Sequence, residues 1–187
     1  MRRAVCALCV TLWAATAYAA DPQTAAMDYI TALTQQDFAH AVKLIRASDL
    51  VEYKKTFDEL FSAEAAAGKK DLLVAAFGPD AKLSDALNAK PDEVFIATMN
   101  VVMGAVKTAN MKLAVQPAKY LGKVSEDEHL VHVLVRTYTK LGDSTTSRVE
   151  VVSTVAEGSD WKVVLPDQLK AIGQVMRRQM ALRAAKP

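Results

Sequence analysis

Two long runs of alternating apolar and polar residues constrain this chain more than any other feature of its sequence. They span Leu130–Leu141 and Ser144–Ala156 and are separated by only two residues, Gly142 and Asp143. A period of two is typical of a β-strand with one buried face, and glycine at the first position of a two-residue loop favours a type II′ turn. The sequence therefore predicts a long antiparallel hairpin.

The short loop also predicts which residues of the hairpin face each other. Counting outward from it pairs Thr137 with Arg148 and Val133 with Val152. A turn at Gly158 leads into a further strand that extends the same sheet. The face expected to meet the helices carries Val131, Val133, Val135, Thr137, Arg148, Glu150, Val152, Thr154, Trp161, Val163 and Leu165.

The opposite face of this sheet is also rich in apolar residues. It is predicted to carry Leu130, His132, Leu134, Arg136, Tyr138, Ser147, Val149, Val151, Ser153 and Val155. That composition is too apolar for an ordinary solvated surface. We therefore expect a second partner on this face, such as another copy of the chain in a homodimer. A register slip by one residue would exchange the two faces.

Before the hairpin, apolar residues follow a helical period. Helices are predicted at Pro22–Gln35, after Asp37, from Asp49, at Asp71–Phe77 and from Pro91. Asp49 followed by Glu52 resembles a capping box, so it is expected to start the third helix. An irregular strand is predicted from Lys112, interrupted by Pro117. Helices followed by a meander, without alternating β and α units, indicate an α+β fold with N-terminal helices packed on a curved antiparallel sheet.

The N-terminus has the three-part layout of a secretory signal peptide. Basic Met1-Arg2-Arg3 precedes an apolar run, which ends in the small-residue site Ala17-Tyr18-Ala19. We expect cleavage near Ala19 or Ala20, so that residues 1–19 are removed and 20–187 form a single α+β domain. This layout predicts a periplasmic or secreted protein.

Cleavage would change both the cysteine content and the charge. Both cysteines, Cys6 and Cys9, lie in the leader, so the mature chain would hold no disulfide, thiol nucleophile or cysteine metal site. The chain has 23 basic and 21 acidic residues, and the leader holds two arginines and no acid, so the mature charges balance. Nucleic-acid binding is therefore not expected. The spacing of the three histidines predicts no metal site, and no cofactor motif is present.

Two stretches of the sequence resemble the NTF2-like superfamily (SnoaL-like, cystatin-like cone). One is Tyr29-Ile-Thr-Ala-Leu-Thr-Gln-Gln-Asp37-Phe38, at the junction of two predicted helices, and the other is Glu157-Gly-Ser-Asp-Trp161-Lys-Val163. The resemblance implies a cone-shaped domain with a pocket inside it. The chain departs from the family in a longer helix-rich region at Ala63–Asn110 and in a C-terminal helix that extends past the common end.

A candidate ligand pocket follows from the inward sheet face, which is apolar with polar groups near one end. The predicted ligand-binding residues are Trp161, Val163, Arg148, Glu150, Thr137 and Val133. For Arg148 and Glu150 we favour an ion pair at the sheet rim, because long charged side chains at strand ends extend into water.

Enzymes of the family, as the resemblance implies, use an aspartate or an Asp/His pair with a tyrosine inside the cone. The candidates for that tyrosine are Tyr29, Tyr53, Tyr120 and Tyr138. No aspartate stands at the predicted inward strand positions to serve as the base. Catalytic residues are therefore not assigned, and the sequence favours binding over catalysis.

These observations predict an exported, non-enzymatic protein that binds a small apolar molecule or another envelope protein in a cone pocket. One alternative is an NTF2-like enzyme of isomerase or hydrolase type acting in the cone. Another is an interaction module that contacts an anionic membrane surface weakly through its basic C-terminal helix, residues 168–187. The cations of that segment are Lys170, Arg177, Arg178, Arg183 and Lys186, and it contains no acid. A solvated helix face explains the same pattern.

Overall fold

The chain folds into seven helices and four strands over the residues that the computed structural model describes, which are 21–108, 113–141 and 144–184. The helices are α1 (Pro22–Thr34), α2 (Phe38–Leu44), α3 (Ala47–Ala66), α4 (Asp71–Phe77), α5 (Leu83–Asn88), α6 (Pro91–Thr108) and α7 (Asp167–Ala184). The strands are β1 (Leu113–Ser125), β2 (Leu130–Leu141), β3 (Ser144–Glu157) and β4 (Asp160–Val163). This arrangement confirms the α+β prediction. The predicted leader, the loop residues 142–143 and residues 185–187 lie outside the described ranges.

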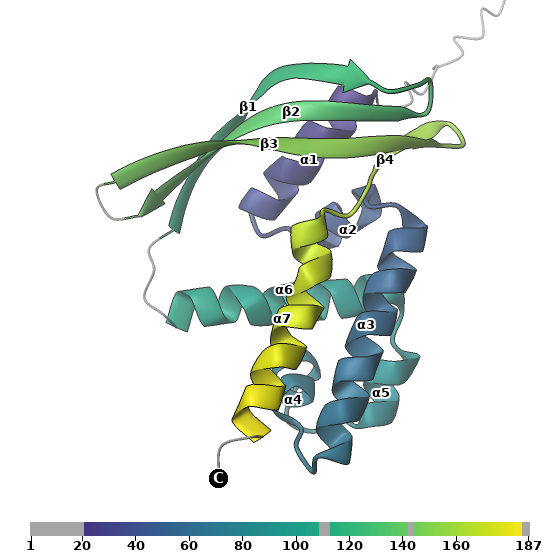
Figure 1. The fold of residues 1–187 in the computed structure, drawn as a ribbon, viewed down its shortest axis with the longest axis vertical. Coiled ribbons are helices and arrows are strands. Elements are labelled where there is room, and N and C mark those ends of the chain that lie inside the picture. Colours follow the sequence, from purple (N-terminus) through teal and green to yellow (C-terminus); the bar gives the residue numbers. More distant parts are fainter. Residues whose placement is uncertain (1–20, 109–112, 142–143, 185–187) are drawn as a thin grey trace, which may run out of the picture.

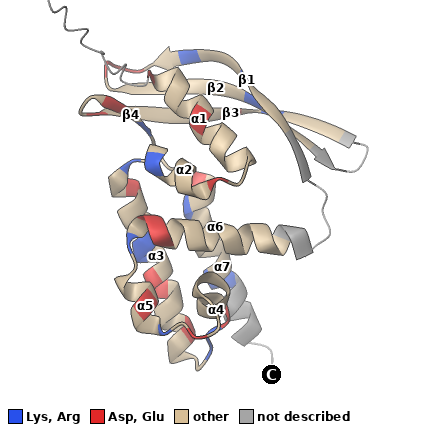
Figure 2. Cartoon of the chain, turned by 180° about the vertical axis from the view of Figure 1, so that it is seen from behind, with Lys and Arg blue, Asp and Glu red and all other residues tan. Residues whose placement is uncertain are grey.

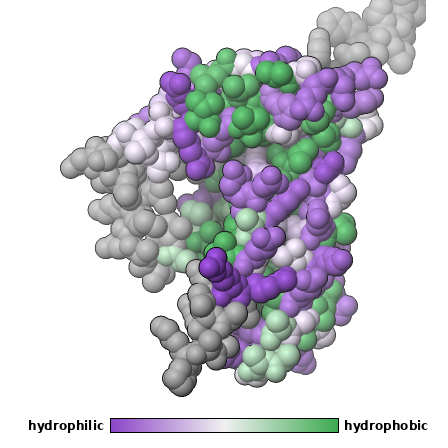
Figure 3. Space-filling model, viewed as in Figure 1, coloured by the Kyte–Doolittle hydropathy of each residue, from purple (hydrophilic) through white to green (hydrophobic). Residues whose placement is uncertain are grey.

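The molecule has two parts, a curved sheet with α1 and a helical layer beyond it. Figure 1 shows the sheet at one end, with α2 between it and the layer formed by α3 to α7. α1 contacts all four strands and lies in front of the sheet when the chain is seen from behind (Figure 2). The opposite face of the sheet bears no helix of the described residues. Hydrophobic side chains gather over the sheet on that uncovered face (Figure 3).

The four strands form one antiparallel sheet in the order β1-β2-β3-β4. Thr137 pairs with Arg148 and Val133 pairs with Val152, which confirms the predicted register. The register of β1 shifts twice, once on either side of Lys119. The first shift surrounds Pro117, because proline has no N–H to donate to a neighbouring strand.

The inward face of the sheet carries the buried side chains that the alternation predicted. Its buried residues are Val131, Val133, Val135, Val152, Thr154, Val163 and Leu165. They share one core with α1, α3 and α6, whose largest fully buried side chains are Tyr29, Phe57, Phe61 and Phe95. The sheet therefore meets the helices through the expected face, and the alternative register is excluded.

The predicted capping box at Asp49 and Glu52 is wrong. α3 begins at Ala47, so Asp49 lies inside its first turn, and only 2% of this residue is exposed. Its carboxylate accepts hydrogen bonds from Leu165 N (2.9 Å) and from the Arg46 guanidinium (2.6 Å). The side chain therefore joins the start of α3 to the segment before α7. A capping box involves only neighbouring residues, so this long-range contact could not be predicted from it.

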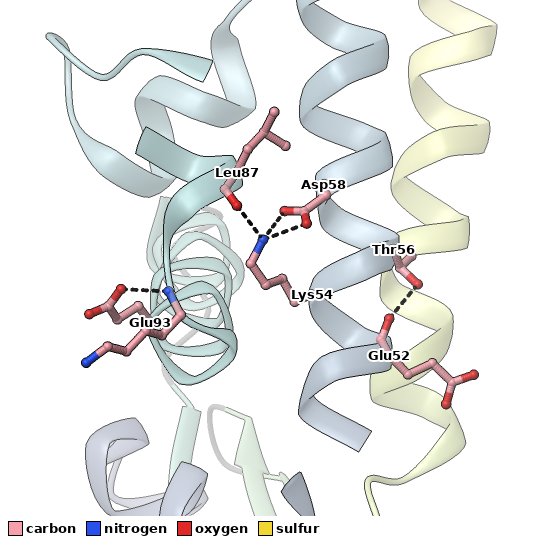
Figure 4. A network of polar contacts seen from close by, with 7 residues as sticks. Glu52, Lys54, Thr56, Asp58, Leu87 and Glu93 are labelled. Carbon is pink, nitrogen blue, oxygen red and sulfur yellow. Dashed lines mark hydrogen bonds and ion pairs between the residues drawn. The ribbon is translucent and has the colours of Figure 1, made fainter. Parts of the chain in front are cut away.

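α7 packs closely on α3 at Gly173. A Cβ atom built there would lie 2.5 Å from Cγ2 of Thr56. Thr56 is β-branched and its hydroxyl donates to the Glu52 carbonyl (Figure 4), so the methyl group has little freedom to move. The closeness of the two helices therefore depends on glycine at this position.

We expect Gly173→Ala to lower the free energy of unfolding by about 1 kcal/mol, because overpacking outweighs the gain in helix propensity. Gly104→Ala in α6 is the matched control, since a Cβ there meets no atom within 4 Å, and it is expected to raise the same free energy by about 0.5–1 kcal/mol. Urea unfolding followed by circular dichroism measures both. Equal stabilisation of the two variants would contradict the close contact.

Candidate functional site

A hollow opens between the sheet and α6, beside the first turns of α7 (Figure 3). α6 packs mainly on α2, α3 and α4 rather than on the sheet, and this arrangement leaves the space. The visible floor of the hollow is hydrophobic. In Figure 1 the end of the sheet where β2 ends and β3 begins lies above α6. We call this space, between the inward sheet face and α6, the inner recess.

Three polar side chains, those of Thr137, Arg148 and Glu150, lie together on the inward sheet face at this end of the sheet. Thr137 Oγ1 donates to Glu150 Oε1 (2.6 Å), and Arg148 Nε donates to the same oxygen (2.8 Å). The predicted ion pair between Arg148 and Glu150 is thus confirmed. The Arg148 side chain is 78% exposed, so the pair adds little to stability. Its effect is to orient the Glu150 carboxylate, which is better shielded, along the inward face.

The phenol of Tyr29 is a polar group in the hydrophobic interior. Tyr29 comes from α1 and is fully buried, and its hydroxyl has no hydrogen-bond partner among the residues that the structure describes. Burial raises the pKa of Tyr29 well above its usual value, and the nearby Glu150 carboxylate and Tyr53 phenol raise it further. An unpaired buried hydroxyl costs about 1–3 kcal/mol. A group retained at such a cost is a candidate for contact with a ligand.

Tyr53, from α3, provides the contrast. Its hydroxyl is hydrogen-bonded to Thr98 Oγ1 on α6 at 2.8 Å, and Thr98 Oγ1 also donates to the Val94 carbonyl. Because the threonine proton is used on that carbonyl, the Tyr53 hydroxyl acts as the donor between them. Burial raises the pKa of Tyr53 to about 12. The Tyr53 hydroxyl therefore has a hydrogen-bond partner in the core, whereas the Tyr29 hydroxyl has none among the described residues.

The predicted site residues do not all lie together. Thr137, Arg148 and Glu150 form the polar group described above. Trp161 pairs with Ala156, which is eight residues from Arg148 along β3, or about 26 Å. The tryptophan is half-buried at the opposite end of the sheet, so it shares a face with Arg148 but not a pocket.

The two remaining predicted residues, Val133 and Val163, are fully buried. They fill the core between the sheet and the helices instead of lining an opening. The structure therefore brings together three of the six predicted residues and adds Tyr29, whose phenol the charge of Glu150 reaches.

Two further concavities lie in the helical layer. One, of about 640 Å³, is formed by α4, α5 and α6, and its lining includes Phe77, Asp85, Ala89, Glu93 and Ile96. The other, of about 420 Å³, lies between α3 and α7, and its lining includes Glu52, Tyr53, Thr56, Asp167 and Lys170. In the first, Asp85 and Glu93 already accept hydrogen bonds from the backbone. Neither lining includes the buried Tyr29 hydroxyl, so neither concavity provides it with a partner.

The histidines lie apart from the inner recess. His132 Nδ1 is hydrogen-bonded to Ser153 Oγ (2.9 Å) and His132 Nε2 to Glu126 Oε1 (2.8 Å), on the uncovered face of the sheet. His40 and His129 are exposed. Within residues 21–184, leaving aside the ranges not described, no three metal-ligating side chains gather in one place.

Two cations of the basic C-terminal segment contact α3. Arg177 Nη2 lies 2.8 Å from Glu59 Oε2, and Lys170 Nζ lies 3.8 Å from Asp49 Oδ1. These two cations are engaged with α3 and are therefore less available to a membrane surface than the sequence alone suggested. Of the described helices, none combines the length and the apolar character needed to cross a bilayer.

Fold and site together define the class of this protein as an α+β domain with helices on one face of an antiparallel sheet and a polar group at one end of that face. Comparisons with protein-family models, with curated proteins and with solved structures found no match.

Proposed function

We propose that this protein is an exported, non-enzymatic binding protein of the cone type, related to the NTF2-like superfamily. It takes a small, largely apolar molecule between the inward sheet face and the helices, next to the buried Tyr29. The observation that carries the proposal is the Tyr29 hydroxyl, which is fully buried and has no partner within the described residues. A ligand that accepts a hydrogen bond from this hydroxyl removes the cost of leaving it unpaired.

The surroundings of Tyr29 favour a neutral ligand. Its raised pKa keeps the phenol protonated, so the group donates a hydrogen bond at physiological pH. The same neighbouring Glu150 charge that raises this pKa disfavours an anionic group beside the hydroxyl. The best fit is an apolar molecule with a neutral acceptor, such as a carbonyl or ether oxygen.

The same pKa argues for binding rather than catalysis. A general acid or base works best when its pKa lies near the working pH. The pKa of Tyr29 is raised away from that range, and Glu150 is engaged by both Thr137 and Arg148. The described part of the inward face thus offers the Tyr29 hydroxyl as a hydrogen-bond donor to a ligand, and neither Tyr29 nor Glu150 is suited to proton transfer.

Tyr29→Phe tests the proposal, because it removes only the hydroxyl oxygen. We expect binding of the neutral, carbonyl-containing dye Nile red to weaken by about tenfold, measured by fluorescence titration. We expect the free energy of unfolding to stay the same or to rise by about 1 kcal/mol, since an unpaired buried group is lost.

Tyr53→Phe is the matched control, since it removes a hydroxyl that is hydrogen-bonded. This variant is expected to lower the free energy of unfolding by about 1 kcal/mol and to bind the dye as the parent does. Unchanged binding by Tyr29→Phe would overturn the proposal. Native mass spectrometry of the secreted protein complements the titration, because it reports both cleavage near Ala19 and any retained ligand.

A further inference from the structure

The groove between α4, α5 and α6, which we call the helical groove, has the size of a small-molecule site. Its volume is about 640 Å³, and such sites usually measure roughly 300–1,000 Å³. Its apolar lining consists of Ala76, Phe77, Ala89, Ile96 and Ala97. All the residues that line it lie in the helix-rich region Ala63–Asn110, where the chain departs from the NTF2-like pattern. The resemblance therefore implies nothing about this groove.

Phe77 gives the helical groove an aromatic wall. Its ring packs nearly edge-on against Phe61 of α3, with the ring centroids 5.7 Å apart and the ring planes at 68°. Phe61 is fully buried, whereas Phe77 is only half-buried, so the contact orients the Phe77 ring while part of it stays accessible. An accessible aromatic ring attracts an organic cation through the negative face of its π-system.

The charged groups of the helical groove are all acidic. Asp85 on α5 and Glu93 on α6 line it together with the amides of Asn88 and Asn100, and its described lining contains no lysine or arginine. Of the ion pairs that the described residues form, none involves Asp85 or Glu93. The groove therefore carries negative charge that is not neutralised by an ion pair, and it complements a cation.

Both carboxylates are held in place by the backbone. Lys82 N donates to Asp85 Oδ2 at 2.8 Å, and Lys90 N donates to Glu93 Oε2 at 2.8 Å. Figure 4 shows this second bond at the start of α6. Such bonds restrict the side chains before a ligand arrives, which lowers the entropy cost of binding. A carboxylate has about four acceptor positions, so each retains capacity for a donor on the ligand.

From the aromatic wall, the apolar lining and the two carboxylates we propose that the helical groove binds an organic ammonium ion. The ligand is a small molecule with a protonated amine on an apolar or aromatic body. The body lies against Phe77 and Ile96, and the amine faces Asp85 and Glu93. The proposal is independent of the neutral ligand proposed beside Tyr29, because the two sites share no residue.

Three probes that differ in their polar group test the proposal. Amide NMR spectra of the secreted protein are recorded at pH 7 during titration with 4-phenylbutylamine, with the neutral 4-phenylbutanol and with the anion 4-phenylbutyrate. We expect the amine to bind with a Kd of about 1 mM or tighter and to shift the amide signals of α4, α5 and α6. The alcohol is expected to bind about tenfold more weakly, and the anion more weakly still, because neither neutralises the carboxylates. An amine that binds no tighter than the alcohol, or shifts centred on Tyr29 instead of α4 to α6, overturns the proposal.

Glu93→Gln tests where the charge acts. Glutamine keeps an oxygen that can accept from Lys90 N, so the start of α6 remains capped while the charge is removed. We expect amine binding to weaken about threefold and alcohol binding to stay the same. Adding Asp85→Asn is expected to bring the total loss of amine affinity to about tenfold.

Asp92→Asn is the matched control. Asp92 is an exposed acid in the same first turn of α6 as Glu93, but it does not line the helical groove. Its variant loses the same charge and is expected to bind the amine as the parent does. Equal losses of amine affinity in Glu93→Gln and Asp92→Asn would show a general charge effect and overturn the site.

Discussion

Replacing Asp49 by alanine is expected to lower the free energy of unfolding by about 3 kcal/mol or slightly more, because hydrogen bonds to a charged group are lost and a buried amide is left without an acceptor. The carboxylate accepts from Leu165 N and Arg46 and lies 3.8 Å from Lys170 Nζ. Its removal leaves a buried N–H without an acceptor and two cations without their counter-charge. Chemical unfolding measures the loss, which we expect to be the largest of any single substitution proposed here.

Asp58→Ala is the control for this experiment. Asp58 also lies on α3 and pairs with Lys54, but the pair is partly exposed, and Lys54 keeps a hydrogen bond to the Leu87 carbonyl (Figure 4). A loss of no more than about 1 kcal/mol is expected. If both aspartate variants lose the same amount, the burial of Asp49 is not what makes it important.

The second large effect is expected at Glu64, near the end of α3. Only 4% of this residue is exposed, and its carboxylate accepts from Leu72 N (2.9 and 3.0 Å) and from Leu73 N (3.2 Å). It therefore caps the start of α4 from another helix, where a negative charge is favourable. Glu64→Ala is expected to lower the free energy of unfolding by about 2–3 kcal/mol, since charged hydrogen bonds are lost and two amides are left without acceptors.

Hydrogen exchange locates this effect within the chain. The amides of Leu72 and Leu73 are expected to exchange faster in Glu64→Ala than in the parent. Glu93→Ala removes an exposed carboxylate that accepts from Lys90 N at the start of α6, and its expected cost is within about 1 kcal/mol. Unchanged exchange at α4 in Glu64→Ala would show that the cap does not hold this helix.

The hairpin could be predicted closely because its determinants are local. A two-residue loop and strict alternation define the pairing of Thr137 with Arg148, and alternation also defines the buried face. α5 was not predicted, since six residues without a strong apolar stripe give little periodic signal. Its start is instead stabilised by the Asp85 side chain, which accepts a hydrogen bond from Lys82 N.

The candidate site was predicted only in part, because alternation defines a face and not a position along it. Trp161 and Arg148 share a face but lie at opposite ends of β3, a separation that counting along the strand could have found. Tyr29 was named only as one of four candidates for a tyrosine inside the cone, because the sequence does not show which phenol is buried without a hydrogen bond. In the structure, Ala25, Ala26 and Ala32 of α1 are buried beside Tyr29.

The long-range contacts of Asp49 have a further consequence, for the order in which the chain acquires its structure. Asp49 and Leu165 are 116 residues apart, and Arg46 N donates to the Val163 carbonyl beside them. The start of α3 is thus anchored only after the chain has been synthesised as far as Leu165. Loops of this length close slowly, and a chain that relies on them stays unfolded longer. For a protein that crosses a membrane before folding, as we propose, this late closure keeps the polypeptide in a form that can be translocated.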